Sequence, residues 1–161
     1  MRGGWAAVTD ALELERLCAD YNRRWNADAF VDGYAVVFHT GRLQILTIPG
    51  TLAAPLQRAL DRRGVFAPSF EHVDTGVRSF LVTTNLRAVE DLHRWRRLLD
   101  RSQPTLGLTV SRQRVALPSG SESTRWIVAP VGADDFPDLA ELLRIADEVR
   151  ETIVNAGGSR G

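Results

Sequence analysis

The feature that most constrains the fold is the alternation of two hydrophobic periodicities along the 161 residues. Segments whose apolar residues recur every three or four positions predict amphipathic helices. Short runs rich in Val, Ile, Phe and Thr lie between them and predict strands. No internal repeat and no interdomain linker interrupts this order. It predicts one α+β domain, with a mixed, mostly antiparallel sheet packed by about four helices.

Apolar spacing and capping residues define the expected helices. Asp10 followed by Glu13 resembles a capping box, and Gly64 can end a helix in the left-handed conformation. Thr51 is a suitable N-cap for the second helix. The four helices are expected from Asp10 to Trp25, from Thr51 to Gly64, from Asn85 or Arg87 to about Ser102, and from Asp134 or Asp135 to Ile153.

Strand-forming runs predict two hairpins and three further strands. The first hairpin joins 34–38 to 43–48 through a turn containing Gly41, and the second joins 70–73 to 77–83 through Asp74-Thr75-Gly76. The further strands are expected at 106–110, 114–117 and 125–128, with a polar loop at 118–124. This loop is the most site-like segment of the sequence.

Composition and charge exclude several classes of protein. The chain is 44% hydrophobic and 25% charged, as is typical of globular domains. Its 20 basic residues, all arginine, balance 20 acidic ones, so no net positive field favours nucleic acid. Lone Cys18 in a helical segment indicates a buried thiol in a reducing compartment. With no signal or membrane segment near the N-terminus, we expect a cytoplasmic domain over residues 1–154 and a disordered tail over 155–161.

Histidine and carboxylate placement predicts neither a metal site nor a cofactor. His39, His72 and His93 fall on separate elements and lack the Cys or carboxylate spacing of zinc sites. Two-metal phosphoryl transfer requires carboxylates that hold the cations, and the expected strands carry almost none.

One nucleophilic constellation is conceivable. His72 and Asp74 are two residues apart and would share a strand face, with Ser79 or Ser69 as the nucleophile of a small hydrolase. No nucleophile-elbow motif accompanies them, and this hypothesis receives the lowest weight.

Two segments could instead bind phosphate. The arginine-rich helix after Asn85 offers guanidinium groups, although Glu90 and Asp91 near Arg94 favour a solvated charged face. The loop Ser119–Thr124 offers hydroxyls for an anion but lacks Walker spacing, so a plain hairpin loop is the favoured interpretation.

Three stretches carry a family resemblance: 42–50, 75–82, and 115–119 followed by 124–130. Together they resemble the N-terminal domain of bifunctional primase-polymerases, especially its short, divergent, stand-alone actinobacterial versions. That family carries a metal-binding Asp-x-Asp motif where Thr47 and Pro49 stand here, and a nucleotide-contacting histidine where Arg78 stands. The resemblance therefore implies the fold without primase or polymerase activity, because neutral Thr47 and Pro49 cannot hold divalent cations.

Three functional hypotheses follow. The first is a catalytically degenerate primase-polymerase-like domain that binds nucleic acid or nucleotide. The second is a protein-interaction or regulatory module, as a homodimer or with another partner, that uses exposed Trp5, Trp25 or Trp126. The third is the hydrolase of His72 and Asp74. No catalytic residue is assigned for the first hypothesis, and its binding residues would be Arg78, Arg112, Arg114, Arg125, Ser119, Ser121 and Thr124.

Overall fold

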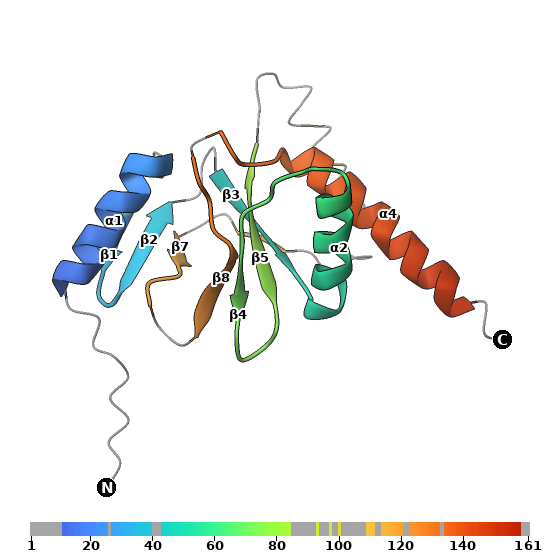
Figure 1. Ribbon diagram of the computed structural model, residues 1–161, viewed down its shortest axis with the longest axis horizontal. Helices are drawn as coiled ribbons and strands as arrows, with labels where there is room; N and C mark the ends of the chain where they lie inside the picture. The colour runs from blue at the N-terminus through green and yellow to red at the C-terminus, as the bar shows by residue number, and fades with distance from the viewer. Residues whose placement is uncertain are drawn as a thin grey trace, which may run out of the picture.

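The computed structural model describes residues 11–25, 27–39, 43–84, 93, 97, 100, 109–111, 114–120, 123–132 and 134–158. These residues form two antiparallel sheets and three helices, so the α+β prediction is confirmed. In Figure 1, helix α1 lies at one side of the sheets, and α2 and α4 lie together at the other.

The helices form where the apolar spacing predicts them. They are α1 (Ala11–Trp25), α2 (Gly50–Arg62) and α4 (Leu139–Gly158). Helix α1 buries Leu14, Cys18, Tyr21 and Trp25, which follow one another at three- and four-residue spacing along one face. The helix expected from Asn85 or Arg87 to Ser102 lies outside the described residues, except for His93, Arg97 and Asp100, which are helical.

The larger sheet has the strand order β6-β3-β5-β4-β8, and its described pairings are antiparallel. Strands β4 and β5 form the predicted second hairpin, and Gly76 has a φ of 68° in its turn. Residues directly opposite each other in neighbouring strands point to the same face of the sheet. The register therefore shows which side chains share each face. The five strands are β3 (Leu43–Ile48), β4 (Ser69–His72), β5 (Arg78–Thr83), β6 (Thr109–Ser111) and β8 (Thr124–Val128).

The predicted first hairpin is wrong. Strand β2 (Ala35–His39) does not pair with β3 but lies between β1 (Phe30–Asp32) and β7 (Arg114–Leu117) in a separate three-stranded sheet. The turn that forms is Gly33-Tyr34, where Gly33 has a φ of 60° and directly follows Asp32. Glycine at the first position of a two-residue loop favours a type II′ hairpin turn. Strands β1 and β7 then occupy both edges of β2, which leaves no edge for β3.

Helix boundaries differ from expectation at three points. Helix α2 is preceded by Pro49 as N-cap, with no side-chain cap from Thr51. Helix α4 begins at Leu139 instead of Asp134 or Asp135, because Pro137 disfavours helical backbone before it and Asp135 Oδ2 accepts a turn hydrogen bond from Gly132 N. It continues to Gly158, so residues 155–158 of the expected tail are helical.

Two hydrophobic cores lie on opposite faces of the larger sheet. We call the first the aliphatic core; it joins that sheet to α2 and α4 through residues such as Leu46, Leu56, Phe80 and Leu142. We call the second the aromatic core; it joins the other face to α1 and the smaller sheet through Tyr21, Trp25, Phe38 and Phe70, with Trp126 packed against it. No described helix is long and apolar enough to cross a membrane.

Candidate functional site

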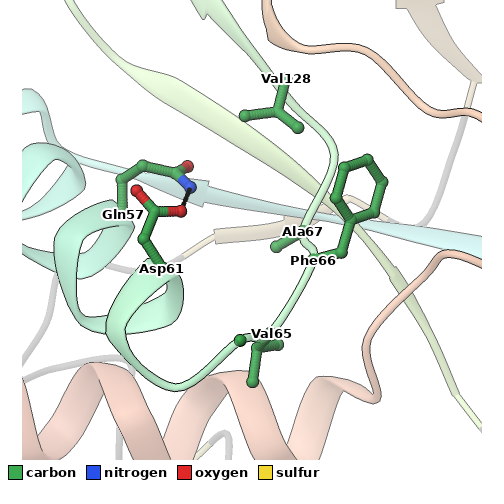
Figure 2. A pocket seen from close by; sticks show the side chains of 7 residues that line it. Gln57, Asp61, Val65, Phe66, Ala67 and Val128 are labelled. Atoms are coloured by element: carbon green, nitrogen blue, oxygen red, sulfur yellow. Dashed lines mark hydrogen bonds between the residues drawn. The ribbon is translucent and has the colours of Figure 1, made fainter.

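An open hollow of about 380 Å³ lies where α2 ends beside the last residue of β8 (Figure 2). We call it the β8 hollow. Helix α2 contributes its C-terminal half, the segment after the helix contributes the floor, and Val128 closes the far wall. The lining residues are Gln57, Asp61, Gly64, Val65, Phe66, Ala67 and Val128.

The local sequence explains this shape. Gln57 and Asp61 are one helical turn apart, and Gln57 Nε2 donates a hydrogen bond to Asp61 Oδ1 at 2.9 Å. Gly64, with a φ of 66°, ends the helix and reverses the chain so that Val65 N donates to Leu60 O at 3.0 Å. The chain then presents Phe66, whose side chain is 43% exposed, at the rim.

Two polar atoms in or beside the β8 hollow have no hydrogen-bond partner among the described residues. Gln57 Oε1 is buried and unpaired, and so is the hydroxyl of Ser69, which is Val128's Cα partner across the β4–β8 ladder. Leaving a buried polar group unpaired costs about 1–3 kcal/mol. The Gln57 acceptor and the exposed Asp61 carboxylate therefore favour a bound group that donates hydrogen bonds or carries positive charge.

Strand β8 is an edge of the larger sheet, because its only described ladder is with β4. The register shifts between Ser69 and Phe70, which leaves Ile127 outside the regular pairing. Ile127 is 37% exposed, so it adds an apolar side chain to the surface of this edge. An edge strand presents backbone N–H and C=O groups that an incoming strand can pair with.

The residues predicted to bind phosphate do not converge. Arg78 and Arg125 share a face across β4, but Glu71 lies between them and binds the Arg125 guanidinium at 2.8 Å. Arg78 Nε is buried without a described partner. Arg114 lies in the other sheet, ion-paired with Asp32 and 5.2 Å from the Phe30 ring centre.

The remaining predicted phosphate-binding residues add no cluster. Ser119 is buried, and Thr124 is half-buried on β8. Arg112 and Ser121 lie outside the described residues. Among the described members of the set, only Arg78 and Arg125 therefore share a surface.

The hydrolase hypothesis finds one of its contacts. His72 Nε2 lies 3.2 Å from Ser79 Oγ, which also lies 3.3 Å from Thr47 Oγ1. Asp74, however, occupies the turn beyond β4, and no described hydrogen bond joins it to His72. Ser79 is only 2% exposed, and Ser69 points to the other face of the sheet, so neither hydroxyl is placed for substrate attack.

Metal-ligating side chains and tryptophans are two further kinds of residue that can carry function. No group of three or more His, Cys, Asp or Glu side chains in the described part of the chain could hold a metal ion. Trp25 is buried in the aromatic core, and Trp126 is half-buried against it. The idea that Trp25 offers an exposed partner surface is therefore wrong, and Trp5 lies outside the described residues.

The register also bears on the resemblance to primase-polymerases. Thr47 pairs with Ser79, whereas Arg78 pairs with Ile48, so Thr47 and Arg78 point to opposite faces of the sheet.

No protein-family model matches the chain, and no curated protein and no solved structure is significantly similar to it. The geometry of the described residues is thus the main guide to function.

Sequence reasoning missed the β8 hollow. A signal for it exists in the polar pair Gln57 and Asp61, which lies beside the apolar stripe of the helix, and in Phe66, two residues after the glycine that ends the helix. Neither is a motif with known chemistry. The hollow becomes visible only when β8, some 60 residues later in the chain, is placed beside them.

Proposed function

We propose that the chain is a protein-interaction module without catalytic activity, and that its partner binds at the β8 hollow and the adjoining edge of β8. The observation that carries the proposal is the open hollow itself, which combines apolar walls, a buried unpaired acceptor and a neighbouring sheet edge. Concave apolar sites with a few placed polar groups are the usual form of binding sites.

The nucleic-acid hypothesis receives less support from the same structure. Of its described arginines, Arg114 and Arg125 are paired with carboxylates, and the overall charge is balanced. Binding to phosphates needs basic groups gathered on one surface without such neutralisation. Binding through Arg78 stays a prediction that a titration with single-stranded DNA at low salt can test.

A display selection tests the proposed function. Random peptides are selected on the immobilised full-length protein, and enriched peptides are then titrated against Phe66→Arg and Tyr34→Arg. Both positions carry exposed aromatic rings, Tyr34 at 83% exposure in the turn of the smaller sheet, so the two variants add the same charge to different surfaces.

The proposal expects enriched peptides that bind the wild type and Tyr34→Arg equally and bind Phe66→Arg at least about tenfold more weakly, since a charge placed in the interface opposes apolar contact. Circular dichroism of both variants checks that they remain folded. Selections that enrich nothing, or peptides that bind Phe66→Arg as tightly as the wild type, would contradict the proposal.

A further inference from the structure

We infer that the β8 hollow takes the side chain of an arginine or lysine from an extended partner segment, which pairs as an added strand with the edge of β8. This inference rests on the proposed function and specifies its ligand. It follows from three features: the chemistry of the hollow's polar groups, the state of the neighbouring arginine, and the shape of the sheet edge.

The described polar side-chain groups of the hollow favour a donor. Asp61 uses Oδ1 for the bond from Gln57 Nε2, which leaves Oδ2 and its negative charge for a ligand. Gln57 Oε1 is buried and lacks a partner. A guanidinium or ammonium group supplies several N–H donors and no acceptor, so it complements these two oxygens.

The apolar walls suit the stem of such a side chain. Val65, Phe66 and Val128 line the approach to the two oxygens, and the hollow is open to solvent at the Phe66 rim (Figure 2). Arginine and lysine bury their methylene groups along apolar surface while the charged head finds polar partners. A cation can also lie over the face of an aromatic ring such as Phe66.

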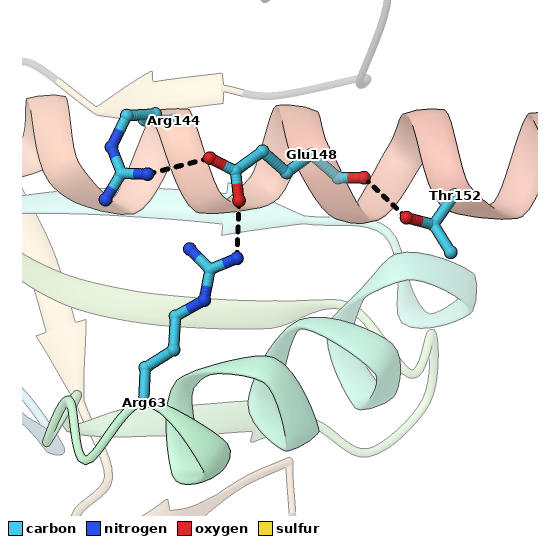
Figure 3. A network of polar contacts seen from close by, with 4 residues as sticks. All are labelled: Arg63, Arg144, Glu148 and Thr152. Carbon is cyan, nitrogen blue, oxygen red and sulfur yellow. Dashed lines mark hydrogen bonds and ion pairs between the residues drawn. The ribbon is translucent and has the colours of Figure 1, made fainter.

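The arginine that follows α2 is engaged elsewhere. Arg63 binds Glu148 of α4, and Arg144 Nη1 holds the same carboxylate at 2.7 Å (Figure 3). Arg63 is thus directed toward α4, although it lies only two residues from Asp61 in the chain. Asp61 keeps its charge available to a ligand on the β8 side.

The partner is expected to be extended because the hollow ends at a sheet edge. Val128 is both the wall of the hollow and the last residue of β8, so a strand added beside β8 would carry alternate side chains past it. Main-chain bonds along an edge supply affinity in such complexes, and pockets for alternate side chains supply specificity.

The test uses defined peptides and the full-length protein. The probe is acetyl-Thr-Val-Arg-Val-Thr-amide, compared by titration with the same peptide carrying Glu in place of Arg and with arginine amide alone. Two further versions are N-methylated at the first valine or at the arginine, because the N–H groups of adjacent residues point to opposite edges of a strand. Amide chemical shifts of residues 124–128 report whether β8 is the contact. The protein variants are Asp61→Asn, Asp61→Arg and, as a control on the same helix, Arg58→Gln.

We expect the Arg peptide to bind at least about tenfold more tightly than the Glu peptide, and Asp61→Asn to weaken it by about three- to fivefold, as suits a solvent-exposed ion pair. Asp61→Arg should reverse the preference, Arg58→Gln should not, and one of the two N-methylations should abolish binding by blocking a ladder hydrogen bond.

Several results would overturn the inference. One is equal binding of the Arg and Glu peptides, and another is insensitivity to both N-methylations. Binding of arginine amide as tight as that of the peptide would show a small-molecule site instead of strand addition. If the display selection yields peptides that need Phe66 but contain no basic residue, the proposed function survives and only this inference fails.

Discussion

The two cores of this protein are built from different chemistry. The aliphatic core, between the larger sheet and α2 and α4, consists of aliphatic side chains and Phe80, and the buried hydroxyl on this face, that of Ser69 opposite Phe80, has no described hydrogen-bond partner. The aromatic core, between the same sheet and α1, contains polar atoms that bond across its elements. Tyr21 donates to Pro118 O at 2.6 Å and accepts from Trp126 Nε1 at 3.0 Å.

The aromatic core is also held by ring contacts and by a buried thiol. The Trp25 and Trp126 rings meet edge to face with centroids 5.7 Å apart, and the Tyr21 and Trp25 rings lie 4.4 Å apart. Cys18 Sγ donates to Ala29 O at 3.1 Å, and burial raises the pKa of this thiol. The expectation of a buried Cys18 is therefore confirmed.

The difference shows two ways to fix a helix on a sheet. On the aliphatic side, the volume and shape of the side chains decide how they fit. The loss in the free energy of unfolding should therefore scale with the number of buried atoms that a substitution removes. On the aromatic side, directional bonds join α1 to β8 and to the segment after β7, so the loss of a single atom can matter. The first four predictions below test this contrast in order of expected size, and the fifth tests how the α2–α4 pair is held at its surface.

The largest effect is expected from Phe80→Ala. Phe80 is fully buried in the aliphatic core, and truncating such a ring costs about 3–5 kcal/mol in the free energy of unfolding. Urea denaturation measures the loss. Phe66→Ala, at the exposed rim of the β8 hollow, serves as the matched control and should cost less than about 1 kcal/mol. A Phe80→Ala cost no larger than that of Phe66→Ala would show that the aliphatic core is not closely packed.

Tyr21→Phe removes one buried oxygen atom and leaves the aromatic ring in place. We expect it to lower the free energy of unfolding by about 1–3 kcal/mol, because the Pro118 carbonyl and the Trp126 indole lose their buried partner. Tyr34→Phe, at an exposed position, should change nothing measurable. If the two variants are equally stable, the contrast between the cores fails.

The same hydroxyl predicts a loss of stability at alkaline pH. Burial is the main cause that raises the pKa of Tyr21, so the folded protein holds this proton more tightly than the unfolded chain. Its contribution is complete below a pH of about 10, the unfolded value, and falls as the pH rises toward the folded pKa. Denaturation midpoints measured from neutral to alkaline pH should fall more steeply for the wild type than for Tyr21→Phe.

Gly50→Ala tests a place on the aliphatic side where backbone touches backbone. A Cβ at Gly50 would lie 2.7 Å from the carbonyl oxygen of Gly76, so the start of α2 or the β4–β5 turn must shift. We expect a cost of about 1–2 kcal/mol. Gly157→Ala in α4, where a Cβ meets nothing within 4 Å, should instead stabilise the helix slightly. Thermal melting of both variants decides whether the two changes have opposite signs.

The smallest effect is expected from Glu148→Gln. The Arg63 guanidinium, together with Arg144, lowers the pKa of this carboxyl, so its contribution to stability is present above the unfolded pKa and is lost as the pH falls. The variant should therefore show a weaker loss of stability below a pH of about 4. Because the ion pair between Glu148 and Arg63 is exposed, added salt should erase the difference in acid stability between Glu148→Gln and the wild type. The control variant Glu141→Gln should lose stability at low pH as the wild type does.

Much of the fold follows from local sequence, because periodicity and turn residues act over a few positions. Helices α1 and α2 and the β4–β5 hairpin lie within a few residues of their predicted limits. Strands β7 and β8 were also expected nearly where they occur. These elements share one property, which is that their own apolar pattern and a nearby capping or turn residue specify them.

The errors arise where a long-range partner decides or, at the start of α4, where a single proline acts. Strand β2 is buried by β1 and β7, and no local rule states that Leu117 would take the place opposite Val36. The start of α4 is set by Pro137 and by a parallel bridge between Asp138 and Thr83. The β8 hollow depends in the same way on Val128 reaching the end of α2, so a site of this kind cannot be read from spacing alone.

The pairing of β2 with β7 has a consequence for synthesis on the ribosome. Val36 must wait for Leu117, about 80 residues later in the chain, before the smaller sheet can close. At usual elongation rates this delay lasts about 4–16 s. During that time the apolar faces of α1 and β2 lack the cover that β7 completes, so the nascent chain exposes apolar surface until about three quarters of its residues have been translated.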